Sequence, residues 1–252
     1  MKPKFSVIIP SHGRLHFLRE AIDSIIQQSY LPLEVMVVDD IPSVDTQQLV
    51  KSYERKTSVL MRYVVNTEKP GALRSRNLGI KYSTGTHLAF IDDDDTWKAD
   101  YLEKIAAVYE QDAGDATLVP FLSFDENMTI KEDKTPPVDF RVQDYYLQNL
   151  GALCTNFTIS REVYDAIGGY DEGVFSSADK DIAMNVSLSG YRVHVLTERL
   201  AMRRVSHADQ WSADGRSIRK GVVLFYKKYF FRMSPLHHAL MLLKILKLYV
   251  KP

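Results

Sequence analysis

The chain has 252 residues, of which 45% are hydrophobic and 25% charged, a composition typical of an ordinary folded protein. Its 32 basic and 32 acidic residues balance, which argues against a nucleic-acid-binding protein because such proteins are usually basic. The single cysteine, Cys154, cannot form an internal disulfide, so we expect a reducing compartment.

The balanced charge is unevenly distributed along the chain. Residues 216–252 carry nine Lys and Arg residues and no Asp or Glu, which leaves 23 basic and 32 acidic residues in 1–215. The apolar runs at Phe5–Ile9 and Ala239–Leu243 are too short for a signal peptide or a membrane span. We therefore expect a cytoplasmic protein with a catalytic domain over 1–215 and a basic helical extension over 216–252.

The first 91 residues predict an alternation of strands and helices. The predicted strands are Phe5–Ile9, Val35–Val38, Leu60–Val65 and His87–Ile91, and the predicted helices between them are Leu15–Gln28, Thr46–Lys56 and Leu73–Tyr82. The strands are short, mostly apolar runs, whereas the helices carry apolar residues three and four positions apart. This alternation is typical of a mostly parallel sheet covered by helices on both faces.

The pattern is weaker in the second half of the chain. Glu126–Asp139 is polar and predicts an exposed connection, followed by a short strand over Thr155–Ile159. A turn at Gly168 and Gly169 then precedes a helix over Asp181–Ser189. A last helix begins at Ser234-Pro235, because Ser is a common N-cap and Pro is favoured at the first helical position.

Three of the predicted strands are followed directly by polar residues. Ser11–Arg14 follows the first strand, Asp39 and Asp40 follow the second, and Asp92–Asp95 follows the fourth. In parallel sheets with helices on both faces, ligands bind beyond the carboxyl ends of the strands. We therefore expect these three segments to form one site.

The four consecutive carboxylates of Asp92–Asp95 repel one another unless cations neutralise them. Mg²⁺ or Mn²⁺, with phosphate oxygens as further ligands, suits such a cluster. The alternative is an acidic cap for a helix that starts near Trp97. The position directly after a buried strand favours the metal–phosphate site.

Two other polar segments allow both a structural and a binding role. Asp39 and Asp40 could begin a turn, or accept hydrogen bonds from a ribose hydroxyl or a base N–H. Arg74 and Arg76 lie in the first turns of a predicted helix, where a guanidinium group suits a phosphate. Pairing with acidic residues on the surface is the alternative for both arginines.

Taken together, the motifs resemble the family 2 glycosyltransferases. The resemblance rests on Val7–Arg14, Val37–Asp40, Gly71–Gly79 and Phe90–Trp97, in this order and spacing, and continues with Gly168–Glu172, Ala178–Ile182 and Gly190–Arg192. It covers residues 5–207 and leaves the C-terminal extension outside. It implies the GT-A fold, an α/β architecture in which helices flank a Rossmann-like, mostly parallel sheet.

The resemblance also implies an activity and its partners. Members of the family move a sugar from a nucleotide sugar, here most simply a UDP-sugar, to a hydroxyl group with inversion at the anomeric carbon. The implied cofactor is a divalent cation, Mn²⁺ or Mg²⁺. The implied acceptor is a saccharide or a lipid-linked glycan in polysaccharide or cell-envelope biosynthesis.

The residues that match the family's donor site come from four segments. Pro10, Ser11, His12 and Arg14 match the loop that contacts the base and ribose, Asp39 matches the acid that reads the base, and Arg76 matches a basic residue near the phosphates. Asp92 and Asp93 match residues that contact the ribose and a metal-bound water, and Asp94 matches the metal ligand. His207 matches a final histidine near the metal, although a lone histidine also has a structural interpretation.

Asp179 matches the family's general base, which is the second acid of a Glu-Asp pair; position 178 is alanine here. A carboxylate within hydrogen-bond reach of an acceptor hydroxyl can remove its proton. Asp181, two residues later, is a second candidate for this role. Both could instead cap the helix that follows.

Two other functions fit part of the pattern. A sugar nucleotidyltransferase has a similar sheet and metal carboxylates, but it needs a Gly-rich phosphate loop and a lysine, which Ser11–Arg14 does not supply. A module that binds nucleotide sugars without catalysis would not need Asp92–Asp95 together with Asp179. We therefore favour the glycosyltransferase.

The C-terminal extension has the pattern of amphipathic helices. Its apolar stripe consists of Leu236, Ala239, Leu240, Leu243, Leu246 and Val250, and basic residues alternate with aromatic residues over 219–232. Basic amphipathic helices bind the surface of anionic membranes. Packing on the acidic body and an oligomer interface are the alternatives.

Overall fold

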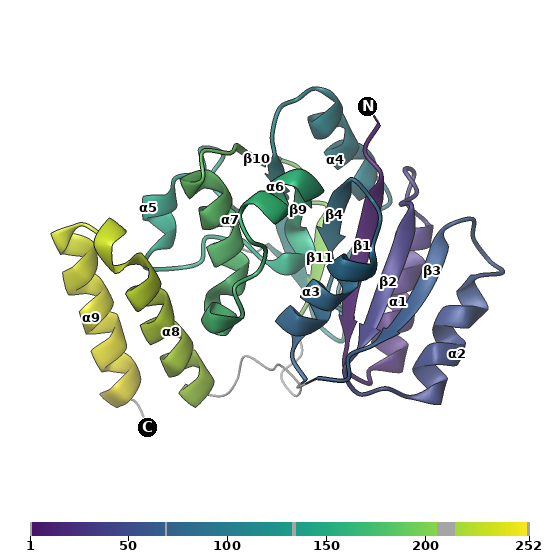
Figure 1. The fold of residues 1–252 in the computed structure, drawn as a ribbon, viewed down its shortest axis with the longest axis horizontal. Coiled ribbons are helices and arrows are strands. Elements are labelled where there is room, and N and C mark those ends of the chain that lie inside the picture. The colour runs from purple at the N-terminus through teal and green to yellow at the C-terminus, as the bar shows by residue number, and fades with distance from the viewer. Residues whose placement is uncertain (1, 69, 133–134, 206–214, 251–252) are drawn as a thin grey trace.

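The computed structural model describes the chain except for residues 1, 69, 133–134, 206–214 and 251–252. Figure 1 shows a central sheet with helices on both faces and a pair of helices, α8 and α9, at one end of the molecule. The arrangement is the expected α/β architecture with a helical C-terminal region.

A seven-stranded sheet in the order β10-β6-β9-β4-β1-β2-β3 forms the centre. Its strands are β1 (Phe5–Ser11), β2 (Glu34–Asp39), β3 (Leu60–Val65), β4 (His87–Phe90), β6 (Ala116–Leu118), β9 (Phe157–Ser160) and β10 (Val193–Val195). β1 pairs in parallel with β2 and β4, and β2 pairs in parallel with β3. β9 runs antiparallel to β4 and β6, so the mostly parallel sheet is confirmed.

The register of the sheet brings the polar strand ends together. Ser11 at the end of β1 pairs with Asp39 at the end of β2. Ile91, which follows β4, donates its backbone N–H to the carbonyl of Ile8 at 3.2 Å. Asp92 and its neighbours therefore leave the sheet beside the end of β1.

Helices cover both faces of this sheet because its strands are apolar on both sides. They are α1 (Leu15–Ile26), α2 (Val44–Tyr53), α3 (Ala72–Tyr82), α4 (Tyr101–Glu110), α5 (Val142–Tyr145), α6 (Arg161–Ala166) and α7 (Ala178–Leu188). Val7 and Ile9 of β1 share a core with α1, α2 and α4, whereas Ile8 lies in a second core with α3, α6 and α7. This alternation follows from the two-residue period of a strand.

A smaller sheet in the order β5-β11-β7-β8 lies beside the main one. Its strands are β5 (Thr96–Trp97), β7 (Phe121–Phe124), β8 (Ile130–Glu132) and β11 (Ala201–Arg204). The expectation of a helix near Trp97 is wrong, because Trp97 lies in β5 and α4 begins at Tyr101 with Asp100 at its N-cap. Asp92–Asp95 therefore does not cap that helix.

Two further boundaries differ from the sequence prediction. The segment expected as one strand over Thr155–Ile159 is a short 3₁₀ turn, η1 (Cys154–Asn156), followed by β9. The helix expected from Asp181 begins at Ala178, directly after the 3₁₀ segment η2 (Glu172–Ser177). Asp179 thus lies in the first turn of α7, where it can face the strand ends.

The C-terminal region consists of α8 (Gly215–Tyr229), the turn η4 (Phe230–Arg232) and α9 (Pro235–Val250). The helix start predicted at Ser234-Pro235 is confirmed. Phe225 and Tyr229 of α8 and Met241 of α9 are buried in the core that also contains α7. Among the described residues, no helix combines the length and the apolarity that a membrane crossing requires.

Candidate active site

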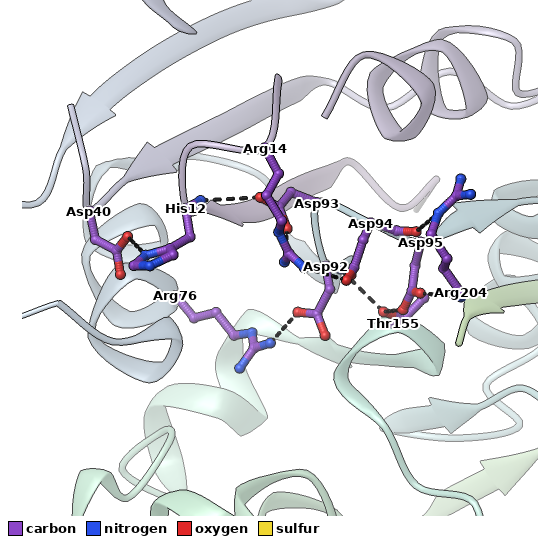
Figure 2. A network of polar contacts seen from close by, with 10 residues as sticks. All are labelled: His12, Arg14, Asp40, Arg76, Asp92, Asp93, Asp94, Asp95, Thr155 and Arg204. Carbon is purple, nitrogen blue, oxygen red and sulfur yellow. Dashed lines mark hydrogen bonds and ion pairs between the residues drawn. The ribbon is translucent and has the colours of Figure 1, made fainter. Parts of the chain in front are cut away.

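The loop after β1 holds the acidic run through two of its residues. The backbone N–H of His12 donates to Asp93 Oδ2 at 3.1 Å, and the guanidinium of Arg14 pairs with Asp93 and, at 2.5 Å, with Asp94 Oδ2 (Figure 2). Gly13 between them has a φ of 72°, a left-handed conformation that glycine adopts without a Cβ clash. The turn at this glycine lets both neighbours face the acids.

Asp92 turns toward α3 instead. Arg76, buried in the first turns of α3, forms an ion pair with the Asp92 carboxylate, and Figure 2 shows the two side chains facing each other. The same guanidinium lies 5.9 Å from the ring centroid of Tyr170. The predicted phosphate-binding arginine and the acidic run therefore share one site.

Asp95 has a structural role in this arrangement. Thr155 Oγ1 donates to Asp95 Oδ2 at 2.5 Å, and the backbone N–H of Arg204 donates to Asp95 Oδ1 at 2.8 Å. Arg204 Nε also donates to the carbonyl of Asp94 at 3.0 Å. Asp95 thus ties the acidic run to η1 and β11.

Burial makes the ionised form of the acidic run unfavourable. It raises the pKa of Asp93 to about 6, with the Asp94 charge adding to the effect and Arg14 opposing it. The pKa of Asp94 is raised by burial and by the Asp92 charge. Additional positive charge at this place would favour the ionised carboxylates.

The strand end of β2 is held by backbone and side-chain donors. Asp39 is fully buried, and its carboxylate accepts from the Tyr63 hydroxyl at 3.0 Å and from the Ile41 N–H at 3.1 Å. Burial raises its pKa in spite of these hydrogen bonds. Asp40 contacts His12 Nδ1 at 2.6 Å and accepts from the Gly71 N–H at 2.9 Å, so Asp40 joins the loops after β1 and β3.

Several polar atoms at this place have no partner within the described part of the chain. They include Ser11 Oγ, Arg14 Nε and Arg76 Nε, all buried. An unpaired buried donor costs free energy that a bound ligand can recover. Three residues predicted from the sequence to contact the donor therefore carry unsatisfied groups. Pro10, also predicted to contact the donor, is buried at the end of β1 beside them.

Asp179 lies close enough to Arg76 to feel its charge, and it contacts Cys154 of η1. Asp179 is half-buried, and its carboxylate accepts a hydrogen bond from the Cys154 thiol at 2.7 Å. The Cys154 sulfur is also 3.3 Å from the hydroxyl of Tyr170. Burial raises the pKa of Asp179, while the Arg76 charge and the thiol hydrogen bond act in the opposite direction.

Asp181 has a different environment from Asp179. Both of its carboxylate oxygens are occupied by α8: Lys228 Nζ donates to one at 2.8 Å and the Tyr229 hydroxyl donates to the other at 2.8 Å. The side chain is buried. Of the two carboxylates, Asp179 contacts η1 through Cys154 and Asp181 contacts α8.

The acidic run offers two partly exposed carboxylates to a cation. The side chains of Asp92 and Asp94 are 39% and 22% exposed, whereas that of Asp93 is 1% exposed. The described residues contain no group of three or more His, Cys, Asp or Glu side chains placed to hold a metal. Two carboxylates fit Mg²⁺ or Mn²⁺ when diphosphate oxygens and water complete the coordination. His207 lies outside the described residues.

Sequence reasoning did not identify four residues of this site. The sequence motifs assign Asp40 no role separate from Asp39, and they assign no role to Thr155, Tyr170 or Arg204. A buried threonine, tyrosine or arginine carries no local signal, because each reaches the site from a different element across the fold. Cys154 was noted only as an unpaired cysteine.

The comparison with protein families decides the classification. Residues 6–168, well over half of the chain, match the family model Glycosyl transferase family 2. The chain belongs to glycosyltransferase family 2. The match contains the strand ends, Arg76 and the acidic run, and it ends before Asp179 and the C-terminal helices.

Curated relatives are glycosyltransferases. The chain is 26% identical over 206 residues to the amylovoran biosynthesis glycosyltransferase AmsB of Erwinia amylovora, covering 78% of this chain and 68% of the relative. It is 35% identical over 103 residues to the putative teichuronic acid biosynthesis glycosyltransferase TuaG of Bacillus subtilis, covering 41% of this chain and 40% of the relative. The aligned segment therefore spans less than half of the second relative's length.

Solved structures share the fold over nearly the whole chain. The S. aureus TarS 1–349 structure in complex with UDP-GlcNAc superposes with a TM-score of 0.75 and 18% identity, covering 98% of this chain and 72% of that one. The mannosyltransferase PcManGT from Pyrobaculum calidifontis, in complex with GDP-Man and Mn²⁺, gives a TM-score of 0.68 and 20% identity, covering 100% of this chain and 71% of that one. This family 2 glycosyltransferase therefore has the GT-A fold.

Proposed function

We propose that this enzyme is an inverting hexosyltransferase that moves a sugar from a UDP-sugar to a hydroxyl of a saccharide or lipid-linked glycan. The setting is the biosynthesis of a cell-envelope polysaccharide, as in the names of the AmsB and TuaG relatives. A UDP donor is favoured because the TarS structure holds UDP-GlcNAc. In this proposal residues 1–215 form the catalytic domain and residues 216–252 the extension.

One observation carries the proposal: Arg76 acts on both the acidic run and Asp179. Its guanidinium pairs with Asp92, and its charge also acts on the carboxylate of Asp179. A donor diphosphate held by Arg76 would thus have the half-buried Asp179 near it. Transfer to a hydroxyl group needs a leaving group and a base close to each other. In this proposal both lie near the guanidinium of Arg76.

The donor would occupy the strand ends of β1 and β2. Ser11 and Arg14 have buried polar atoms without partners among the described residues, and these atoms can bind the nucleoside. His12 contacts Asp40, and Asp39 is fully buried. In this assignment Asp39 orients the loop that reads the base, together with Pro10 and His12, and Asp92 and Asp93 contact the ribose side.

A divalent cation would be held by Asp94, with Asp92 beside it. When bound, such a cation supplies positive charge that stabilises the leaving diphosphate. The Mn²⁺ of the PcManGT structure supports this assignment. His207 is proposed as a further ligand from the family resemblance.

The transfer itself uses Asp179. The ionised carboxylate accepts the proton of the acceptor hydroxyl, whose oxygen forms the new bond to the anomeric carbon. The bond from that carbon to the diphosphate oxygen breaks, and Arg76 stabilises the charge that develops on the leaving group. A single displacement of this kind inverts the anomeric configuration.

The proposal also places the enzyme in the cytoplasm, at the inner face of the membrane where a lipid-linked acceptor is presented. The relative WfgD of Escherichia coli, 34% identical over 98 residues and covering 39% of this chain and 38% of the relative, is named as acting on a diphosphoundecaprenol-linked sugar. Contact with that membrane is assigned to the extension over 216–252.

Thermal unfolding in the presence of donors tests the proposed function. With Mn²⁺, a UDP-sugar is expected to raise the melting temperature more than GDP-mannose does, because a ligand that binds the native state stabilises it. The Asp94→Asn variant should lose the Mn²⁺-dependent part of the shift. Stabilisation by UTP with a sugar 1-phosphate, and none by nucleotide sugars, would favour a nucleotidyltransferase and overturn the proposal.

Inversion has its own test. Transfer to an acceptor hydroxyl gives a glycoside whose anomeric configuration NMR can identify, because a glycosidic bond does not equilibrate between anomers in solution. The proposal predicts a product of opposite configuration to the donor. A product with the donor's configuration would contradict the single displacement.

A further inference from the structure

The outward face of α9 is unusually apolar. Of the 17 large hydrophobic side chains that are exposed among the described residues, eight lie within Phe230–Tyr249: Phe230, Phe231, Leu236, Leu240, Leu242, Leu243, Leu246 and Tyr249. Phe231, in the turn before α9, is 97% exposed. Exposed apolar surface concentrated in one segment marks an interaction site.

The apolar stripe predicted from the sequence faces away from the protein. At 3.6 residues per turn, Leu236, Leu240 and Leu243 lie on one side of α9, and all three are exposed. The opposite side packs inward through Met241, which is 1% exposed. Figure 1 shows α9 as the outermost helix, on the far side of α8 from the central sheet.

A basic groove adjoins this face. Arg219, Lys220 and Lys227 of α8 line an open groove of about 390 Å³ together with Tyr249 of α9. Tyr249 belongs to the exposed apolar set as well, so the groove and the apolar face are continuous. A groove of this size that is lined by three cations and an aromatic ring suits a phosphate-bearing headgroup.

We propose that the outward face of α9 and the adjoining basic groove bind the surface of a bilayer that contains anionic phospholipids. The leucines enter the boundary between headgroups and acyl chains, and Arg219, Lys220 and Lys227 contact the phosphates. This proposal rests on the proposed function, which assigns the membrane contact to residues 216–252, and it names the residues that would make that contact. Lipid binding is measured without sugar transfer, so the two can fail separately.

Charge favours a membrane over a second copy of the chain as the occupant. Residues 216–252 carry nine basic and no acidic residues, so two such faces would repel each other when they meet. An anionic lipid surface attracts the same residues. The acidic body over 1–215 is repelled from that surface, which orients the molecule with α9 toward the lipid.

Vesicle flotation with the full chain tests this inference. The protein is expected to bind phosphatidylcholine vesicles with about 30% phosphatidylglycerol and to bind pure phosphatidylcholine vesicles at least about tenfold more weakly. The double variant Leu240→Glu, Leu243→Glu should bind the anionic vesicles at least about tenfold more weakly. Lys220→Glu with Lys227→Glu should lower binding by a similar factor and reduce its sensitivity to salt.

The matched control is Met128→Glu with Ile130→Glu, two exposed apolar residues near β8, which should bind vesicles as the wild type does. Circular dichroism melting checks that each variant is folded. Anionic-vesicle binding that is unchanged in both α9 and groove variants would overturn the proposal. So would a dimer in analytical ultracentrifugation that the leucine variant dissociates while vesicle binding persists.

Discussion

At the scale of single residues, the thiol of Cys154 is positioned to control the proposed base. It donates to Asp179 at 2.7 Å, and this hydrogen bond lowers the pKa of the carboxyl, whereas burial raises it. The thiol itself stays protonated, since burial raises its pKa well above the ordinary value. Cys154 is therefore a permanent donor that favours the ionised form of Asp179 against the effect of burial.

The first prediction concerns the pH dependence of transfer. Asp179 must be ionised to accept a proton, so the rate falls as the pH drops through its pKa. Cys154→Ala removes a hydrogen bond to the ionised form, which raises that pKa. The acidic limb of the kcat profile should therefore move to higher pH, as measured by product release across a pH series.

Cys154→Ser is the control, because its hydroxyl can donate to Asp179 in the same way. It should restore most of the wild-type profile. If the alanine variant keeps the wild-type acidic limb, the thiol has no influence on the group that titrates.

Also at the scale of single residues, hydrogen-bond partners distinguish Asp179 from Asp181, which the sequence alone could not do. The family motif favours Asp179 as the base but leaves Asp181 as a second candidate, because the two lie two positions apart in one segment. The structure distinguishes them through Lys228 and Tyr229, which come from a helix some 47 residues later in the chain. A local sequence pattern does not predict hydrogen-bond partners that lie so far apart in the chain.

At the scale of elements, the first turn of α7 joins the site to the C-terminal helices. Lys228 of α8 donates to Asp181 at 2.8 Å and to Asp171, which precedes η2, at 2.9 Å. Lys180 Nζ donates to the carbonyl of Tyr145 at 2.8 Å and lies 3.7 Å from the ring centroid of Phe225. The helices outside the family match thus hold the element that carries Asp179.

The second prediction tests this connection. Lys228→Met leaves the buried Asp181 carboxylate without its cation, which should lower the free energy of unfolding by about 2 kcal/mol. Urea denaturation measures the loss. Lys227→Met, at the neighbouring exposed lysine, should change stability by less than about 0.5 kcal/mol; equal effects of the two variants would contradict the connection.

The third prediction concerns Lys180, whose pKa burial lowers to about 7, with the nearby Lys244 charge adding to the effect. Between about pH 7 and pH 10 the unfolded chain keeps a proton on this amine that the folded chain has lost. Stability should therefore rise with pH through this window, by at most about 1.4 kcal/mol per pH unit. Lys180→Met should remove that contribution from the difference between the two stability curves.

Urea denaturation at pH 6, 8 and 10 provides the curves. Other titrating groups affect both proteins equally, so the difference isolates Lys180. A difference that is constant across the series would contradict a lowered pKa.

The sequence predicts the elements of the first half of the chain better than those of the second half. β1 and β2 are buried along their whole length, so they appear in the sequence as short, mostly apolar runs, and each ends where its polar residues begin. The second half contains β5, a strand of two residues, and β9, which runs antiparallel beside parallel neighbours. Such short strands form because neighbours pair with them, which sequence periodicity does not record.

At the scale of the whole molecule, the acidic region over 1–215 and the basic extension over 216–252 are joined by ion pairs at α8. The acidic part over 1–215 contributes Asp171 and Asp181, and the basic extension contributes Lys228. The extension is also part of the core, because Phe225, Tyr229 and Met241 are buried with α7. Its apolar outward face then remains for a partner.

The fourth prediction follows from this shared core. A chain that ends at residue 215 loses the burial of Phe225, Tyr229 and Met241, each contributing roughly 1.5–3 kcal/mol, and leaves Asp181 buried without a cation. Since whole domains are stable by only about 5–15 kcal/mol, the shortened chain should melt at a much lower temperature or fail to fold. Circular dichroism melting tests this, and wild-type stability of the shortened chain would show that the extension is an independent unit.

The proposed reaction depends most on Asp179 as the general base, and one measurement tests that role directly. The Asp179→Asn variant is assayed for nucleotide release from its preferred UDP-sugar with Mn²⁺, alongside the thermal shift that the same donor produces. Asp165→Asn, at an exposed carboxylate of α6, is the control. We expect Asp179→Asn to lower the rate at least about a hundredfold while the donor still shifts the melting temperature as in the wild type. A wild-type rate in Asp179→Asn would contradict the assignment.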